Sequence, residues 1–136
     1  MNFREHQKHV WSIYFSQSYP IRLERGGDDG YVKIWNINQE VSIDTINMNA
    51  IVCVVQFSLD SSWILALEST DKNIYCYDLW NIKTPWCILA SHNKTVSNVK
   101  FLDSTNLVSA SIDGTLKLWD LVTRIGGDNL QPCSDI

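Results

Sequence analysis

The stretch GTLKLWD, residues 114–120, places bulky side chains on one face and a lysine on the other and ends on an acid, which is typical of a short β-strand. Forty-two positions before Trp119 lies Tyr77, in KNIYCYD, and another 42 positions before that lies Trp35, in GYVKIWN. Because one pattern recurs at a fixed interval, the sequence predicts a fold assembled from repeated units.

Two further columns of residues support this repeat. An acid lies six residues before each member of the aromatic column: Asp29, Asp71 and Asp113. Phenylalanines form another column, with gaps of 42 and 44 residues: Phe15, Phe57 and Phe101. The third unit therefore has two extra residues, which we assign to its leading connection, WNIKTP, because connections tolerate insertions.

Each unit divides into short segments with a period of two, separated by polar or turn residues, as β-strands are. The expected strands are WSIYF, IRLE, YVKIW and VSIDTI, then VCVVQF, WILALE, NIYCYD and WCILA, then VSNVKF, LVSAS and TLKLW. Asp29-Gly30 and Asp113-Gly114 predict tight hairpin turns, and Asp71-Lys72-Asn73 predicts a weaker one.

The composition of the 136-residue chain favours a folded, soluble protein. Hydrophobic residues make up 45% and charged residues 19%, which argues against disorder. A net charge of −4 without a run of Lys or Arg argues against direct nucleic-acid binding. The longest aliphatic run, AIVCVV at 50–55, is too short to cross a membrane.

We expect no metal, no other cofactor and no catalysis. Four cysteines lack a Cys-x-x-Cys spacing and are interpreted as reduced, mostly buried thiols: Cys53, Cys76, Cys87 and Cys133. Three histidines lack the spacing of a metal site: His6, His9 and His92. The stretch GGDDG at 26–30 favours a hairpin turn over a phosphate or calcium loop.

Four-stranded antiparallel units of about 40 to 45 residues that end in Trp-Asp resemble the blades of WD-repeat β-propellers. The resemblance implies an all-β, partial propeller of about three blades, with the last blade incomplete. We expect the blades near residues 5–46, 47–90 and 91–121, within a WD-repeat region at 1–121. The tail, residues 122–136, is expected to be irregular.

The WD resemblance also implies a structural hydrogen-bond relay in each blade. The third unit is expected to have all four members: His92, Ser111, Asp113 and Trp119. The first unit has Gly27 in place of the hydroxyl, with the other members His6, Asp29 and Trp35. The second has Met48 in place of the histidine, with Ser69, Asp71 and Tyr77. A Ser-His-Asp hydrolase is the alternative, but the chain has no Gly-x-Ser-x-Gly elbow.

Several longer phrases resemble one plant group. EHQKHVWSIYFS, VKIWNINQEVSIDTI, YCYDLWNIK and SHNKTVSNVKFLDSTNLVSASIDGTLKLWDL are similar to the propeller of the SPA (suppressor of phytochrome A) proteins and of their partner, the constitutive photomorphogenic ubiquitin ligase. The resemblance implies a non-catalytic recognition module in a nuclear ubiquitin-ligase complex that represses light signalling. The implied partners are transcription factors or photoreceptors and the other ligase subunits.

In that family the top face of the propeller binds short Val-Pro peptides with acidic flanks. The resemblance implies that Trp11 forms the aromatic wall, that Lys94 attracts the flank and that Cys53 lines the groove. His9 stands where the family has an arginine, so the affinity for acidic flanks is expected to fall and to depend on pH. An alternative interpretation stays open, in which Trp11 is a core residue and Lys94 is a solvated cation of a loop.

A second family feature is missing. Where relatives that dock on the ligase adaptor have an arginine, this chain has Trp80, and an indole cannot form the charged, forked hydrogen bonds of a guanidinium. An alternative function is therefore a truncated structural or regulatory fragment that binds no peptide and competes for assembly partners. Open blade edges would also allow self-association.

Overall fold

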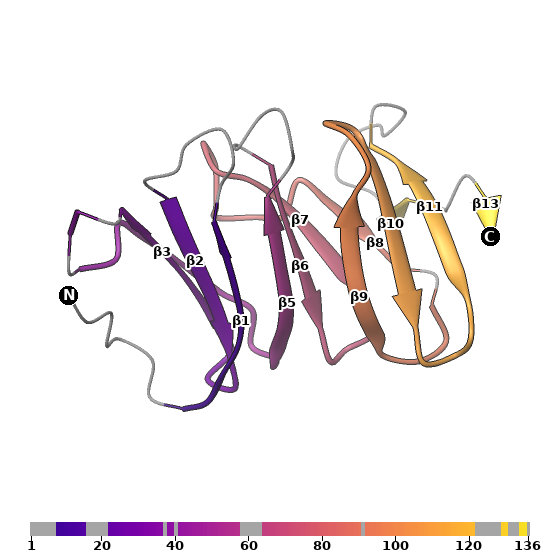
Figure 1. The fold of residues 1–136 in the computed structure, drawn as a ribbon, viewed down its shortest axis with the longest axis horizontal. Coiled ribbons are helices and arrows are strands. Elements are labelled where there is room, and N and C mark those ends of the chain that lie inside the picture. The colour runs from indigo at the N-terminus through magenta and orange to yellow at the C-terminus, as the bar shows by residue number, and fades with distance from the viewer. Residues whose placement is uncertain are drawn as a thin grey trace.

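The computed structural model describes residues 8–15, 22–36, 38–39, 41–57, 64–90, 92–121, 129–130 and 134–135, and every regular element in these ranges is a β-strand. The strands form three sheets that stand side by side in chain order (Figure 1). This arrangement confirms the predicted all-β fold, in which repeated sheets pack like propeller blades. No helix in the described ranges is long and apolar enough to span a membrane.

Each sheet is built mainly from strands that are consecutive in the chain. The first contains β1 (Val10–Phe15), β2 (Arg22–Gly27), β3 (Tyr31–Asn36) and β4 (Asp44–Asn47). The second contains β5 (Val52–Phe57), β6 (Ile64–Ser69), β7 (Ile74–Asp78) and β8 (Cys87–Leu89), with β12 (Asn129–Leu130) at its edge. The third contains β9 (Val96–Phe101), β10 (Asn106–Ser111), β11 (Leu116–Asp120) and β13 (Ser134–Asp135).

The core lies between the sheets, and strand β6 shows how. All six of its residues are buried, because successive side chains point to opposite faces and both faces are covered. Leu65 and Leu67 belong to the apolar cluster shared with the first sheet. Ile64 and Ala66 belong to the cluster shared with the third sheet. The middle sheet is therefore packed on both sides.

A side chain also ties the second sheet to the third. Strand β5 packs between β1 and β9, so these three strands line one side of the row (Figure 1). From β5, the side-chain Oε1 of Gln56 accepts a hydrogen bond from the Phe101 backbone N–H in β9, at 3.2 Å. Gln56 is 4% exposed, so this contact satisfies a buried backbone donor across the junction.

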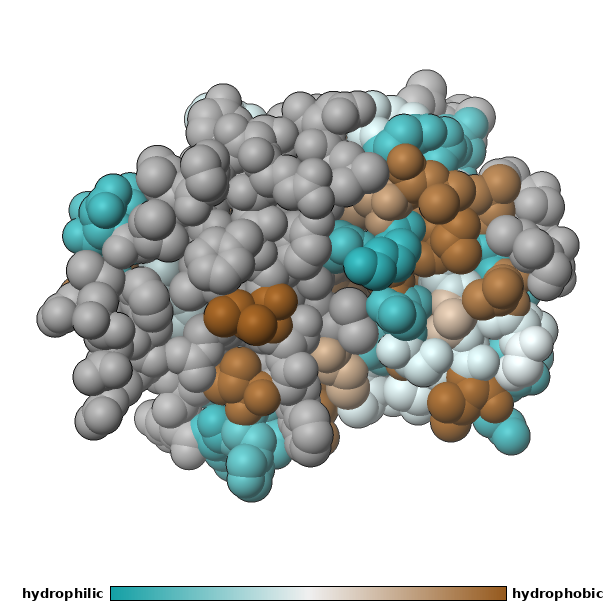
Figure 2. All heavy atoms as spheres, in the orientation of Figure 1, coloured by the Kyte–Doolittle hydropathy of each residue, from teal (hydrophilic) through white to brown (hydrophobic). Residues whose placement is uncertain are grey.

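The outer face of the third sheet is less covered. Val108 and Leu118 are paired in register and half-buried, and Leu116 is 41% exposed. Ala66 and Cys76, which lie 42 residues before Val108 and Leu118, are fully buried against the third sheet. Hydrophobic side chains accordingly gather over the third sheet, on the right of Figure 2.

The C-terminal residues pair with two sheets. Strand β12 runs parallel to β8, and β13 runs antiparallel to β11. The sequence predicts neither strand: the tail at 122–136 was expected to be irregular and the last blade to be incomplete. Residues 134–135 instead give the third sheet a short fourth strand. Pairing there satisfies backbone groups that the edge of β11 would otherwise leave to water.

The hairpin turns between the second and third strands of each sheet lie at one edge, which we call the hairpin edge (residues 28–30, 70–73 and 112–115; lower edge in Figure 1). Gly30 and Gly114 have φ angles of 77° and 86°, in the left-handed region that glycine tolerates. Lys72 occupies the equivalent position of the second sheet with φ 76°. This lysine is where the sequence predicts the weaker turn.

We expect Lys72→Gly to stabilise the chain by up to about 1 kcal/mol, because a side chain in the left-handed region costs about 1–2 kcal/mol and the entropy that glycine adds to the unfolded state offsets part of this gain. Lys72→Ala is the control, since it removes the charge and keeps a Cβ. Urea unfolding measures both. A Lys72→Gly variant no more stable than Lys72→Ala would contradict the role of the backbone angle.

Candidate functional site

A buried relay of polar side chains braces the third sheet at the hairpin edge. Trp119 Nε1–H donates a hydrogen bond to Ser109 Oγ at 2.8 Å, and Ser109 Oγ lies 2.7 Å from His92 Nε2. On the other side of the ring, His92 Nδ1 lies 3.3 Å from Asp113 Oδ2. These distances fit a neutral imidazole that donates to the carboxylate and accepts from the serine hydroxyl.

Asp113 is the most heavily hydrogen-bonded member of this relay. It accepts from the Thr115 hydroxyl at 2.6 Å and from the backbone N–H groups of Thr115 and Asn93, each at 2.9 Å. These donors, with the Thr115 hydroxyl first, hold the pKa of Asp113 well below its ordinary range. The imidazole of His92 is fully buried, so the relay connects strands and loops and is closed to a substrate.

The prediction that Ser111 supplies the hydroxyl of the relay is wrong. The serine that joins His92 to Trp119 is Ser109. Ser111 Oγ instead contacts the carbonyl oxygens of Lys94 and Thr95, at 3.1 and 2.9 Å. Both serines point to the same face of β10, so the period-two pattern cannot separate them. The pairing register of β10 with β11 distinguishes the two serines. Trp119 lies opposite Leu107, which makes Ser109 the diagonal neighbour of Trp119.

This correction changes the expectation for the other two units. Forty-two residues before Ser109 lies Leu67, and 42 before that lies Arg25, so neither unit has a hydroxyl in the relay column. Asp29 accepts from the Tyr31 N–H at 3.2 Å, and Asp71 accepts from the Asn73 N–H at 3.1 Å. These acids stabilise their own turns.

The remaining predicted relay residues belong to the first two units. Trp35 and Tyr77 are buried, at 0% and 6% exposure. The hydroxyl of Tyr75 donates to Asp71. Ser69, assigned to the relay of the second unit, is buried without a hydrogen-bond partner for its hydroxyl among the described residues. His6 lies outside the described residues, and Gly27 is the last residue of β2.

Three bulges mark the predicted peptide groove. The register shifts at Trp11 in β1, at Cys53 in β5 and at Ser97 in β9, which are 42 and 44 residues apart. Each bulge lies where its strand starts, beside the hairpin edge, and a bulge re-aims the side chain that it carries. The side chain of Trp11 lies outside the described part of the structure, whereas Ile13 on the same strand is 59% exposed.

Two of the residues predicted for the groove, His9 and Lys94, are exposed on loops that lead into β1 and β9. His9 Nδ1 lies 3.2 Å from Asp28 Oδ2, and the Asp28 N–H donates to the His9 carbonyl oxygen at 2.9 Å. The loop before β1 is thereby fixed to the first hairpin turn, and Asp28 partly offsets any charge on the imidazole.

Cys53 is half-buried, and Cys76 and Cys87 are fully buried. None of the three forms a disulfide. Burial raises the pKa of Cys53 to about 11, and the carboxylates of Glu68 and Asp28 add to the shift. Its thiol stays protonated at neutral pH, which makes it a poor nucleophile. Cys133 lies outside the described residues.

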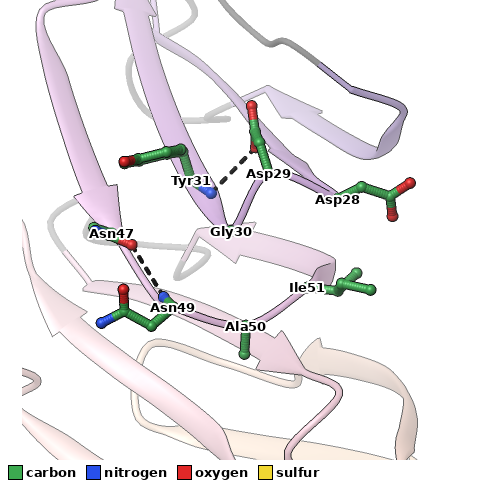
Figure 3. A pocket seen from close by; sticks show the side chains of 8 residues that line it. All are labelled: Asp28, Asp29, Gly30, Tyr31, Asn47, Asn49, Ala50 and Ile51. Carbon is green, nitrogen blue, oxygen red and sulfur yellow. Dashed lines mark hydrogen bonds between the residues drawn. The ribbon is translucent and has the colours of Figure 1, made fainter.

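A polar hollow of about 320 Å³ lies at the hairpin edge, between the first turn and the loop into β5 (Figure 3). Its lining residues are Asp28, Asp29, Gly30, Tyr31, Asn47, Asn49, Ala50 and Ile51. The Asn49 N–H donates to the Asn47 side chain at 3.0 Å, which fixes this loop. Within the described ranges no three His, Cys, Asp or Glu side chains are grouped to hold a metal ion.

Trp80 lies on the opposite edge from the hairpin turns, directly after β7, and is 84% exposed. Its backbone N–H donates to Asp78 Oδ1 at 2.8 Å, and Asn81 N–H donates to the Asp78 carbonyl oxygen at 2.9 Å. A tight turn therefore presents the indole to solvent.

We expect Ser109→Ala to destabilise the chain by about 1–3 kcal/mol for each buried partner left without its hydrogen bond, His92 and Trp119. Ser97→Ala, an exposed serine on the neighbouring strand β9, is the control and should cost a few tenths of a kcal/mol at most. Urea unfolding measures both variants. Equal losses in the two would mean that Ser109 is not the joint of the relay.

Comparison with known proteins agrees with the repeat and its sheets. The family "WD domain, G-beta repeat" matches residues 1–36 and 83–120. Protein SPA1-RELATED 3 and protein SUPPRESSOR OF PHYA-105 1 of Arabidopsis thaliana are each 54% identical to this chain, over 95% and 96% of its length. E3 ubiquitin-protein ligase COP1 of the same plant is 45% identical over 89% of the chain.

The matched regions make up 15%, 12% and 18% of those three relatives, so the chain spans less than a fifth of the length of each. The repeat of 42 residues, the three packed sheets and the relay of the third sheet fit the same assignment. The chain belongs to the WD-repeat family, and within it to the group that contains the plant SPA proteins and COP1.

Proposed function

We propose that this protein-interaction module binds short Val-Pro peptides with acidic flanks at the hairpin edge, along the bulges of the neighbouring strands β1, β5 and β9. WD repeats are interaction modules and do not themselves catalyse reactions, and the relatives' WD regions support a role of this kind. The observation that carries the proposal is the set of three bulges in neighbouring strands.

The apolar part of the site would be formed by the bulge residues. The pairing register shifts at Trp11 and at Cys53, near the starts of two strands that pack against each other, and a bulge interrupts the regular alternation of a strand. An aromatic surface suits a Val-Pro dipeptide, because proline packs well on a flat ring and fixes the peptide in an extended form. The protonated thiol of Cys53 adds a small apolar neighbour.

The charged part of the site would be formed by the loops into β1 and β9. Lys94 is exposed, and its carbonyl is fixed by Ser111, so the backbone that carries this ammonium group is held in place. His9 would place its exposed imidazole beside the acidic flank of the peptide. Asp28, at 3.2 Å from His9, would compete with an acidic ligand for the imidazole.

We propose further that the module acts in the nucleus, within a ubiquitin-ligase complex. The support is the similarity to a protein named E3 ubiquitin-protein ligase COP1 and to SPA proteins. Exposed Trp80 replaces a charged residue at the adaptor position, so we expect contact with the complex through other surfaces. A fluorescent fusion of the chain, imaged in plant cells, tests the nuclear location.

Peptide binding can be tested by fluorescence anisotropy with a labelled Val-Pro peptide that carries acidic flanks. We expect Trp11→Ala and Lys94→Glu each to weaken binding at least about tenfold, since they remove the apolar wall and reverse a flanking charge. Lys83→Glu, an exposed lysine after β7, is the matched control and should bind as the parent does. Unchanged affinity in both groove variants would refute this location.

A second prediction concerns Asp28. Asp28→Asn should tighten binding of the acidic peptide about two- to fivefold, because His9 and the groove lose a competing negative charge. Asp44→Asn, an exposed acid in β4, makes the same change of net charge elsewhere and should have a smaller effect. Binding titrations of the labelled peptide at pH 6 and pH 8 measure the change in affinity. Equal gains in affinity in the two variants would mean that net charge causes the effect and that the position of Asp28 does not matter.

A further inference from the structure

Glu68 is a fully buried acid in the middle of the row of sheets. It is 0% exposed, and neither of its carboxylate oxygens has a hydrogen-bond partner among the described residues. Forty-two residues before it lies Gly26, and 42 residues after it lies Ala110. The other two units thus have a small residue at this position, and an acid is the exception.

Glu68 faces the junction between the second and third sheets. It lies opposite Ile74 of β7 in register, so the two side chains share a face. Ile74 belongs to the apolar cluster that joins these sheets, together with Ala66 and, from β9, Val96. The carboxyl group therefore lies at the end of an apolar interface, near the hairpin edge.

The polar groups around Glu68 do not neutralise a negative charge. On β5, the Cys53 thiol is close enough to affect the carboxyl without the geometry of a hydrogen bond. In the β6–β7 turn lies Asp71, another acid. On the loop before β9, Lys94 is exposed, and the ring of His92 is occupied by Ser109 and Asp113.

This environment favours the neutral acid. The pKa of Glu68 is raised from 4.5 to about 7: burial has the largest effect, the Cys53 thiol lowers the pKa, and the charge of Asp71 raises it. An acid with a raised pKa binds its proton more tightly in the folded state than in the unfolded state. Its contribution to stability is greatest below about pH 4.5 and is lost as the pH rises to about 7.

We propose that Glu68 is a proton-controlled latch of the junction between the second and third sheets: the neutral acid packs against the third sheet, and its ionisation loosens that packing. A charge at this position cannot be buried without a partner, so the junction must admit water or open. The latch lies beside the bulge of β5 and would act whether or not the groove binds a peptide.

Two cysteines report on this junction directly. Cys76 and Cys87 are fully buried, free of disulfides and part of the cluster between the second and third sheets. A thiol reagent labels them only when the junction opens. Dividing the labelling rate of the urea-unfolded chain by that of the folded chain at the same pH gives a protection factor, which removes the intrinsic pH dependence of the thiols.

The experiment measures protection of Cys76 and Cys87 at pH 6 and pH 8, with peptide mass spectrometry to separate the cysteines. We expect protection to fall about tenfold between these pH values in the parent chain. Glu68→Gln should abolish this fall. Asp44→Asn, an exposed acid on the first sheet, should retain it.

Glu68→Ala provides a second variant, since alanine is the residue of the third unit at this position. It too should show protection that does not change with pH, even if glutamine is poorly accommodated. A parent chain whose protection is the same at pH 6 and pH 8 would overturn the proposal. The proposal would also be overturned if protection in the Glu68 variants fell between pH 6 and pH 8 as much as in the parent chain.

Discussion

The packing of one sheet against the next is the constraint on which the rest of this structure depends. A four-stranded sheet of about 40 residues has two faces and cannot bury both alone, so it is stable only beside neighbours. Strand β6 shows the result, with every residue buried and alternate side chains in two different clusters. The fixed spacing of 42 residues follows from this, because it returns each apolar residue to the same face.

At the hairpin edge, the apolar junction between the second and third sheets gives way to polar groups, and the two sheets accommodate these groups differently. The third sheet turns Ser109 and His92 inward, and each polar atom of the relay finds a partner. In the second sheet, Glu68 finds none among the described residues. The two acids consequently shift in opposite directions: hydrogen-bond donors lower the pKa of Asp113, and burial raises that of Glu68.

Much of the fold could be predicted because its signals are local and repeated. The aromatic column, the period-two strands and the Asp-Gly turns are visible in the sequence, and the sheets follow them. Choosing Ser109 over Ser111 required the register of β10 against β11, which two serines on one face cannot reveal. The left-handed Lys72 also depends on the hairpin around it, since lysine has no preference for that conformation.

The site was predictable in a more limited sense. Resemblance to relatives singled out Trp11, Cys53 and Lys94, but no local pattern signals the bulges at the starts of β1 and β5. Glu68 was missed because an acid within WILALE looks like the polar member of an alternating strand. Only the burial of both faces of the second sheet makes it exceptional.

The short strands β12 and β13 have a consequence for contacts between molecules. The outermost strand of a sheet offers unpaired N–H and C=O groups, which can recruit an extended segment from another polypeptide. Here the chain itself occupies part of those positions, beside β8 and β11. Strand addition is therefore blocked along the parts of β8 and β11 that the tail covers.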